Sequence, residues 1–315
     1  MEVLTAVDGE RMTAQRRRDE FFWLDLVSPS EADLDGLRDS LGLHEMALED
    51  TREFGQRPKV DLYQDYVLLV FYTARRAEEG ERVVEPVEVH LYISGHWIVT
   101  VRHRPSVVLD QLHHALVPEG TQAEDYLVYR ILDGLTDAFY PAISDLEERI
   151  DELEGEVLVR PERNHLRRVY RLKQEVHELQ RLLAGQHDQF HTASSAILDL
   201  AGLSRSQREY LRDVGDHLSQ IGGELQRQND DLMALTSTYF NATTEKVNRT
   251  ATRLTVLATF FVVWTLVTGF FGQNFDWLTS NVESRGDFLV FGVGGLIVPT
   301  VALATILWIK RHDWF

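Results

Sequence analysis

Cysteine is absent from this chain of 315 residues. Disulfide bonds, a zinc site built from thiolates and a cysteine nucleophile are therefore excluded. Any metal ion must be held by oxygen or imidazole ligands, which favours hard cations such as Mg²⁺ and leaves Zn²⁺, Co²⁺ and Ni²⁺ open through histidine. Residues 1–9 also lack an apolar stretch long enough to form the core of a signal peptide.

Two sequence patterns of enzymes and pumps are missing as well. The chain has no Gly-Lys-Ser/Thr loop that would cradle a phosphate, so nothing favours ATP-driven pumping. No nucleophile, base and oxyanion donor can be placed together, so an enzyme is not expected. The formal charge of −18 disfavours nucleic acid as a partner and attracts cations, although a merely solubilising acidic surface explains it equally well.

The N-terminal third has the pattern of a mixed α/β domain. Ser28-Pro29-Ser30-Glu31 combines a cap residue, a proline and an acidic residue, and predicts the start of a helix. Along residues 87–93, apolar residues alternate with polar or aromatic ones, which predicts a strand with one buried face. The segments with strand-like composition are 22–26, 60–62, 66–72, 87–93 and 97–101.

Strand patterns end near Glu124, and apolar residues then recur every three or four positions. The pattern predicts one helix up to Pro161, a second over residues 162–200, and a third that continues without proline to Phe271. At about 1.5 Å per residue the third helix would be on the order of 100 Å long. Gly215, Gly222 and Gly223 weaken it locally.

Two uncharged runs close the sequence, 254–271 with 18 residues and 288–309 with 22. Each approaches the roughly 20 residues that span a bilayer. Buried helices of a soluble protein are the alternative. Because basic residues precede the first run and follow the second, the positive-inside rule places both termini in the cytoplasm. The predicted segments are an α/β domain at 1–123, a helical stalk at 124–253, membrane helix 1 at 254–271, an outer loop at 272–287, membrane helix 2 at 288–309 and a tail at 310–315.

One helical hairpin cannot enclose a pore, so a conducting assembly would need several copies around an axis. The first membrane helix suits that axis because small or mildly polar residues form one stripe along it. A small-residue packing seam between helices is the alternative explanation. The stripe comprises Asn248, Ala251, Ala258, Val262, Thr265 and Gly269.

At the end of this helix, Thr268 to Phe275 contains Gly272-Gln273-Asn274. This segment resembles the Gly-Met-Asn signature of the CorA family of magnesium transporters, and the likeness covers nearly the whole chain. It implies a funnel-shaped homopentamer in the plasma membrane, the inner membrane of a bacterium. Each subunit would have an α+β cytoplasmic domain, a long helical stalk and two transmembrane helices. Further matches are Leu48-Glu49-Asp50, Gln56 to Val60, Asp125-Tyr126-Leu127 with Asp133, and Arg212 to His217.

The resemblance also implies roles for individual residues. Asn274 would bind a hydrated cation at the outer mouth, with Gly272 permitting close approach of the backbone and Gln273 between them. Leu254 would form a hydrophobic constriction. Asn248 and Thr265 would match polar pore-lining positions, and Ala251 and Val262 stand where bulkier residues often narrow the pore. Ala258 is a pore position by its place on the stripe. A regulatory cation that clamps the closed state would be held by Glu49 and Asp50 of one subunit and Asp213, Asp216 and His217 of the next, with Asp133 as a further ligand.

The chain departs from the family pattern at Gln273, which stands in place of methionine, and in Asp276 to Ser280, which replace an acidic Pro-Glu-Leu motif. We expect passive, gated Mg²⁺ influx with cytoplasmic cation sensing. The alternatives are a Zn²⁺, Co²⁺ or Ni²⁺ transporter of ZntB type, with or without proton coupling, and a membrane-anchored cation sensor that does not conduct. No organic cofactor is expected. His187 and His191 have the spacing of a helical zinc pair, but a solvated helix face explains them better.

Overall fold

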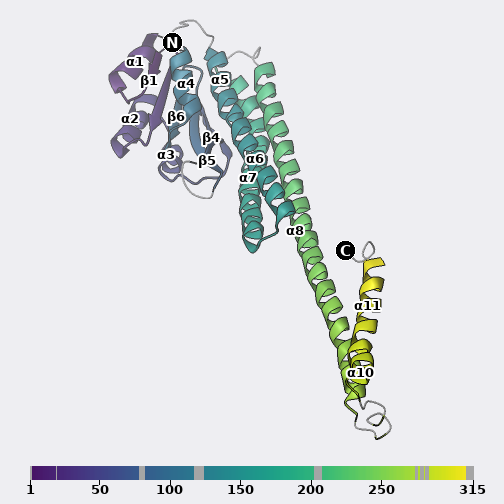
Figure 1. The fold of residues 1–315 in the computed structure, drawn as a ribbon. Coiled ribbons are helices and arrows are strands. Elements are labelled where there is room, and N and C mark those ends of the chain that lie inside the picture. Colours follow the sequence, from purple (N-terminus) through teal and green to yellow (C-terminus); the bar gives the residue numbers. More distant parts are fainter. Residues whose placement is uncertain are drawn as a thin grey trace. The chain divides into compact units, whose positions relative to one another are not determined.

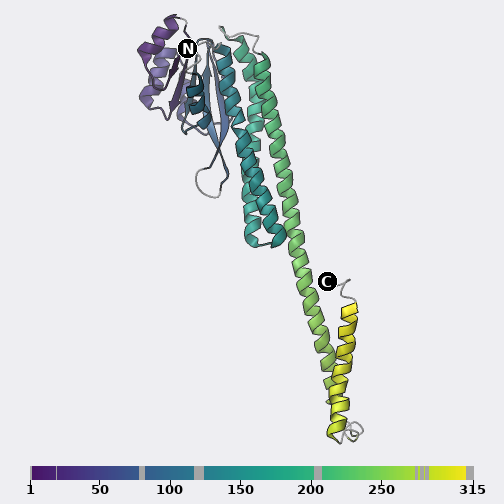
Figure 2. The same ribbon diagram turned by 45° about the horizontal axis from the view of Figure 1, so that its top comes forward.

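The computed structural model describes residues 2–18, 20–77, 82–116, 124–201, 208–273, 276, 280 and 284–309 (Figures 1 and 2). The chain divides into two units, Met1–Thr236 and Ser237–Phe315. The first contains the sheet and the helices around it. The second contains the two apolar helices. Helix α8 (Arg208–Phe271) contributes residues to both.

A six-stranded mixed sheet forms the centre of the first unit, with strand order β1-β2-β6-β5-β4-β3. β1, β2 and β6 run parallel, whereas β5, β4 and β3 follow as antiparallel neighbours. The strands are β1 (Glu2–Leu4), β2 (Phe22–Val27), β3 (Lys59–Leu62), β4 (Val67–Arg76), β5 (Val84–Ile93) and β6 (Trp97–Arg102). The five strands expected from composition are therefore present, and the three-residue β1 was not foreseen.

Helices cover both faces of this sheet. Side chains of alternate residues, such as Phe22 and Leu24 of β2, pack with α1 (Gly9–Arg18), α2 (Glu31–Leu41) and α3 (Glu45–Arg52) in one core cluster. The intervening Trp23 points to the other face, where its ring meets His113 of α4 (Val107–Leu116) edge to face. The result is a three-layer α/β/α arrangement (Figure 1).

The coverage of both faces corrects one expectation. The alternating pattern of β5 predicted a single buried face, but His90 and Tyr92 on the other face are 0% exposed. Tyr92 OH donates to the Ala47 carbonyl at 2.7 Å, and His90 Nε2 lies 2.8 Å from Glu88 Oε1. In β5, alternation between apolar and polar residues therefore did not indicate a solvent-exposed face, because the polar side chains are buried and hydrogen-bonded within the domain.

Local sequence explains the ends of α2. Ser30 caps the helix, its side chain accepts from the Asp33 N–H, and the Asp33 side chain accepts from the Ser30 N–H. This reciprocal arrangement is a capping box. The Ser-Pro-Ser-Glu segment predicted the helix start with Ser28 as the cap and Pro29 as the first helical residue, but the cap is Ser30 and the helix begins at Glu31. At the other end Gly42 takes a left-handed conformation with φ of 73°, which costs glycine little.

Long helices lie against the β4 side of the sheet: α5 (Glu124–Asp137), α6 (Phe139–Val159), α7 (Arg163–Asp199) and the first part of α8. In both views α5, α6, α7 and α8 lie side by side (Figures 1 and 2). Gln186 of α7 joins them to the sheet, since its side-chain oxygen accepts from the Tyr72 N–H at 2.6 Å and its amide donates to the Tyr72 carbonyl at 3.1 Å. The glycines at 215, 222 and 223 do not interrupt α8.

The second unit is a pair of apolar helices. The first is the C-terminal part of α8, which ends at Phe271. The second begins with α10 (Arg285–Asp287), continues as the π-helix η2 (Phe288–Val293) and then as α11 (Gly294–Ile309), which contains Pro299. Both helices are long and apolar enough to cross a membrane, with a mean hydropathy of 1.7 and 2.2 over their most apolar 18 residues. Neither apolar stretch is buried within the structure. The wide π-helical turn was not expected from the sequence.

Candidate functional site

Asp133, Asp213 and His217 come together in the first unit, although 80 residues separate the two carboxylates in sequence. Each offers one ligand atom, and these atoms lie within 4.8 Å of one another. Asp133 projects from α5, whereas Asp213 and His217 are four residues apart and therefore share a face of α8. Two carboxylates and one imidazole form a donor set suited to a divalent cation.

The surroundings of Asp133 favour a cation. The residue is 7% exposed, and burial together with the negative charge of Asp137 raises the pKa of its carboxyl group. Oδ1 of Asp133 and Nδ1 of His217 are buried without a hydrogen-bond partner in the part of the chain that the structure describes. A bound cation would lower the cost of the charged carboxylate and satisfy the buried acceptor.

Two neighbours of this cluster were missed in the sequence. Asp137 Oδ1 lies 3.4 Å from His217 Nδ1, and Tyr129 OH donates to Asp213 Oδ2 at 3.4 Å. Burial and the nearby carboxylate of Asp133 raise the pKa of Tyr129 to about 12, so it stays a neutral donor. Spacing could have revealed both residues, because Tyr129, Asp133 and Asp137 follow one another at four-residue intervals along α5.

The other predicted ligands lie elsewhere in the single chain. Asp216 lines a cavity between α7 and α8 rather than the cluster. Glu49 is exposed on α3, and Asp50 Oδ2 forms an ion pair with Lys59 Nζ at 2.6 Å. The structure thus brings three of the six predicted ligands together.

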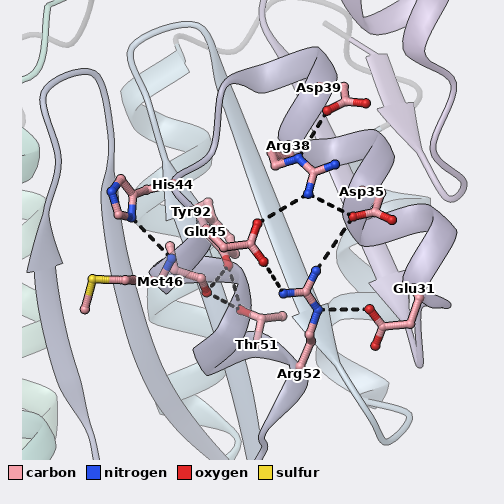
Figure 3. Close-up of polar contacts among 11 residues, drawn as sticks. Glu31, Asp35, Arg38, Asp39, His44, Glu45, Met46, Thr51, Arg52 and Tyr92 are labelled. Atoms are coloured by element: carbon pink, nitrogen blue, oxygen red, sulfur yellow. Dashed lines mark hydrogen bonds and ion pairs between the residues drawn. The ribbon is translucent and has the colours of Figure 1, made fainter.

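An ion-pair network holds α3, the helix that carries Glu49 and Asp50, against α2 (Figure 3). Arg52 Nε lies 2.9 Å from Glu31 Oε2, and Arg52 Nη1 lies 2.7 Å from Glu45 Oε1. Arg38 also contacts Glu45, at 3.3 Å. The two guanidinium groups hold the pKa of Glu45 below its ordinary value. His44 caps α3 by accepting from the Met46 N–H at 3.2 Å.

The predicted pore stripe lies on an exposed face of α8. On this part of α8 the partly buried side chains are Thr252, Val256, Phe260, Val263 and Val267. Ala258, Thr265 and Gly269 are each two residues from one of these positions, which is about 200° around a helix. Val262 is 67% exposed. Asn248, Ala251 and Leu254 are exposed as well. Within the described chain the stripe is therefore no packing seam with α11.

A hydrogen bond joins the other side of this helix to its partner. Trp264 Nε1 donates to Thr300 Oγ1 at 2.8 Å, and Thr300 Oγ1 donates to the Leu296 carbonyl at 2.6 Å. Pro299 of α11 has no N–H to donate to the carbonyl four residues earlier, and Leu296 is the next residue after that carbonyl. α11 runs beside the end of α8 in both views (Figures 1 and 2). This contact leaves the stripe on α8 free.

The signature begins where α8 ends. The Gly272 N–H donates to the Thr268 carbonyl at 2.8 Å, and a Cβ at position 272 would lie 3.1 Å from that oxygen. Glycine thus relieves a tight approach of the backbone. Gln273 lines an open groove with Val262, Thr265 and Gly269. Asn274 lies outside the described residues, as do Lys310 and Arg311.

Comparison with known families decides the class of protein. A family model described as a CorA-like Mg²⁺ transporter protein matches residues 18–311. The chain belongs to the CorA family. It is accordingly a divalent metal ion transporter of the cell membrane with two transmembrane helices, and CorA family transporters are not enzymes.

Relatives in this family carry different ions. The cobalt/magnesium transport protein CorA of Thermotoga maritima is 26% identical over 298 residues, which cover 93% of this chain and 83% of the relative. The zinc transport protein ZntB of Yersinia pseudotuberculosis is 24% identical over 300 residues, covering 93% and 87%. Family membership therefore leaves the ion to be argued from this chain's residues.

The CorA fold is found in solved structures as well. The complete structure of the CorA magnesium transporter from Methanocaldococcus jannaschii superimposes with a TM-score of 0.79 at 20% identity, covering 93% of this chain and 91% of that one. The mixed α/β domain, the long helix α8 and the two apolar helices are thus the architecture of a CorA protein.

Proposed function

We propose that this CorA protein is a passive, gated Mg²⁺ channel assembled as a homopentamer. The exposed stripe of α8 carries the proposal, because it turns small and mildly polar side chains away from α11. In a ring of copies these residues would surround the axis, with Leu254 as the constriction and Asn274 at the outer mouth. A ring of neutral amide oxygens suits Mg²⁺, which gives up its water shell reluctantly.

Gating would depend on the acidic cluster. Asp133, Asp213 and His217 would bind a cytoplasmic cation, and Glu49 and Asp50 of a neighbouring subunit would approach it. Such an interface repels itself when empty, so a bound cation would favour the closed arrangement and make influx self-limiting. Lys59, paired with Asp50 in the single chain, would have to release that carboxylate.

The proposed topology places both termini in the cytoplasm. Residues 1–123 would form the cytoplasmic α/β domain, residues 124–253 the stalk and residues 310–315 a cytoplasmic tail. The basic side chains Lys246, Arg249 and Arg253 before the first membrane helix support this orientation. Residues 272–287 would face outward.

The decisive experiment measures Mg²⁺ entry into liposomes that contain the purified protein. We expect Asn274→Ala to abolish influx while the oligomer keeps its size in native mass measurements. Asn241→Ala, on the same helix before the membrane segment, is the matched control and should conduct. Unchanged influx in Asn274→Ala would refute the proposed pore mouth.

Two alternatives are tested in the same liposomes. Gln273 replaces the signature methionine and so leaves the transported ion open, and the imidazole of His217 would suit Zn²⁺, Co²⁺ or Ni²⁺ as the ion that the cluster binds. A competition series among these ions and Mg²⁺, with and without a pH gradient, distinguishes a transporter of these ions from a magnesium channel. A cation-dependent change in protease resistance without flux of any ion would instead identify a sensor that does not conduct.

A further inference from the structure

A cavity of about 540 Å³ lies between α7 and α8 of the first unit. Gly215 and Ser219 line it, and each is two residues from His217, about 200° around the helix. The cavity therefore lies on the side of α8 away from the acidic cluster. Its volume is in the range of small-molecule sites.

Apolar residues form the floor of this cavity. Phe190 and Leu211 both line it and are 3% and 4% exposed. A Cβ at position 215 would lie 3.8 Å from the Phe190 ring, so glycine leaves the space above that ring open without strain. The floor can receive the organic part of a ligand.

The rim of the cavity is basic, in a chain whose formal charge is −18. Arg208 and Arg212 of α8 and His187 and His191 of α7 line it, and Asp216 is the one carboxylate among the described lining residues. Within the described chain, neither guanidinium group makes an ion pair or a side-chain hydrogen bond. Among the described residues of the rim, two guanidinium groups therefore outweigh one carboxylate.

The hydrogen-bond donors that remain free also favour an anion. The hydroxyl groups of Ser194 and Ser195 already donate to the His191 carbonyl, at 3.0 and 3.3 Å. The guanidinium groups, the His191 imidazole and the Ser219 hydroxyl are then the donors that a ligand can use, whereas Nδ1 of His187 lies 3.9 Å from the carboxylate of Asp188. Guanidinium groups bind phosphate oxygens in a two-pronged geometry.

We propose that this cavity binds a small phosphorylated molecule, with Arg208 and Arg212 contacting the phosphate and the apolar floor contacting its organic part. The i, i+4 spacing of His187 and His191 would also suit a metal ion. Two guanidinium groups beside them would repel a cation, so the anion is favoured. The proposal goes beyond ion transport, and neither depends on the other.

The test is equilibrium binding by calorimetry to the purified full-length protein in detergent. AMP is the probe, because it joins a phosphomonoester to a planar group, and adenosine and inorganic phosphate are its two parts. We expect AMP to bind, inorganic phosphate to compete with it, and adenosine to bind at least about tenfold more weakly. Arg208→Gln combined with Arg212→Gln should weaken AMP binding by a factor of about ten or more.

The control is Arg227→Gln, which removes one positive charge from α8 outside the cavity and should bind AMP like the unaltered protein, and Arg208→Gln and Arg212→Gln are each compared with it singly as well as together. Equal affinity for adenosine and AMP would overturn the proposal, as would equal affinity of the double variant and the control. Absence of AMP and phosphate binding at millimolar concentration would overturn it too. The proposal would also be overturned if the protein binds Zn²⁺ but not AMP, and if replacing both His187 and His191 by asparagine abolishes that Zn²⁺ binding. If the protein admits no ions in the liposome experiment, the proposed channel function fails, but AMP binding is measured separately and still decides this proposal.

Discussion

Nδ1 of His217 lies 3.6 Å from Oδ1 of Asp133, and both atoms are buried without a hydrogen-bond partner among the described residues. Buried polar atoms are usually paired, so the contact between α5 and α8 is incomplete in the single chain. A cation between the two atoms would complete it. The cluster therefore links α5 to α8, and the stability of this contact would rise with the cation concentration.

Replacement of Asp133 by asparagine should separate stability from cation binding. We expect Asp133→Asn to raise the free energy of unfolding of the metal-free protein at neutral pH by about 1 kcal/mol, because the variant removes a buried charge beside Asp137. The variant should gain little stability from Mg²⁺. Thermal unfolding in EDTA and in MgCl₂ measures both effects.

The pH dependence of this difference has a defined sign. Since the pKa of the Asp133 carboxyl is raised above the ordinary value of 3.8, its penalty is present above the raised pKa and disappears as the pH falls below 3.8. The two proteins should converge in acid. Asp231→Asn, an exposed acid on α8, is the control. A Mg²⁺ response of Asp133→Asn equal to that of the unaltered protein would rule out Asp133 as a ligand.

The stripe predicts a contrast between two threonines of α8. Thr265 and Thr259 both donate to the backbone carbonyl four residues earlier, at 2.7 and 2.8 Å. Thr265 is on the stripe and Thr259 is not. We expect Thr265→Val to lower Mg²⁺ influx into liposomes several-fold, because a hydroxyl oxygen is lost from the proposed pore wall. Thr259→Val should conduct normally, and an equal effect of both changes would argue against the stripe.

The hydrogen bond between Trp264 and Thr300 should couple the two apolar helices. In a double-mutant cycle with Trp264→Phe and Thr300→Val, we expect a coupling energy of about 0.6 kcal/mol and at most about 1.7 kcal/mol, the average and the maximum for hydrogen bonds between membrane helices. Reversible unfolding in mixed micelles supplies the four free energies. A coupling energy near zero would mean that this hydrogen bond contributes nothing to helix pairing.

Glu88 should make the α/β domain sensitive to acid. Burial opposes ionisation of Glu88, but hydrogen bonds from His90 and from the Gly55 N–H prevail and lower its pKa. Its stabilising effect is therefore present above the ordinary pKa of 4.5 and is lost as the pH falls through the lower folded value.

At pH 7 we expect Glu88→Gln to lower the free energy of unfolding by about 1 to 3 kcal/mol. The difference should shrink in acid, and denaturant titrations at several pH values would show it. Glu154→Gln, at an exposed position of α6, is the control. A difference that is constant with pH would mean that the Glu88 charge is not what stabilises the fold.

Local patterns were sufficient for most elements of the fold. The start of α2, the strand compositions and the uncharged runs each depend on neighbouring residues, and each of these elements is present, although α2 is capped at Ser30, two residues later than predicted. β1 was missed because three residues carry no period. The buried state of His90 was missed because it depends on helices that cover the sheet from elsewhere in the chain.

The candidate site shows the same division. Asp213 and His217 share a helix face that the sequence displays, but only tertiary packing brings α5 beside them. Asp133 was predicted as a ligand from the resemblance to the family. Asp137 and Tyr129 were missed, although their four-residue spacing from Asp133 along α5 would have indicated them. The pairing of Trp264 with Thr300 and the π-helical turn depend on helix packing, for which the two apolar runs contain no signal.

The two hydrogen bonds between Gln186 and the backbone of Tyr72 have a consequence for solubility. β3 pairs with β4 only from Val67 to Val70, so the rest of β4 presents an open strand edge beyond that point. Open edges invite strands of other molecules and lead to aggregation. By pairing with both backbone groups of Tyr72, the carboxamide occupies the place that an intruding strand would need. The Gln186 side chain thereby removes the Tyr72 backbone groups from those that a strand of another molecule could pair with.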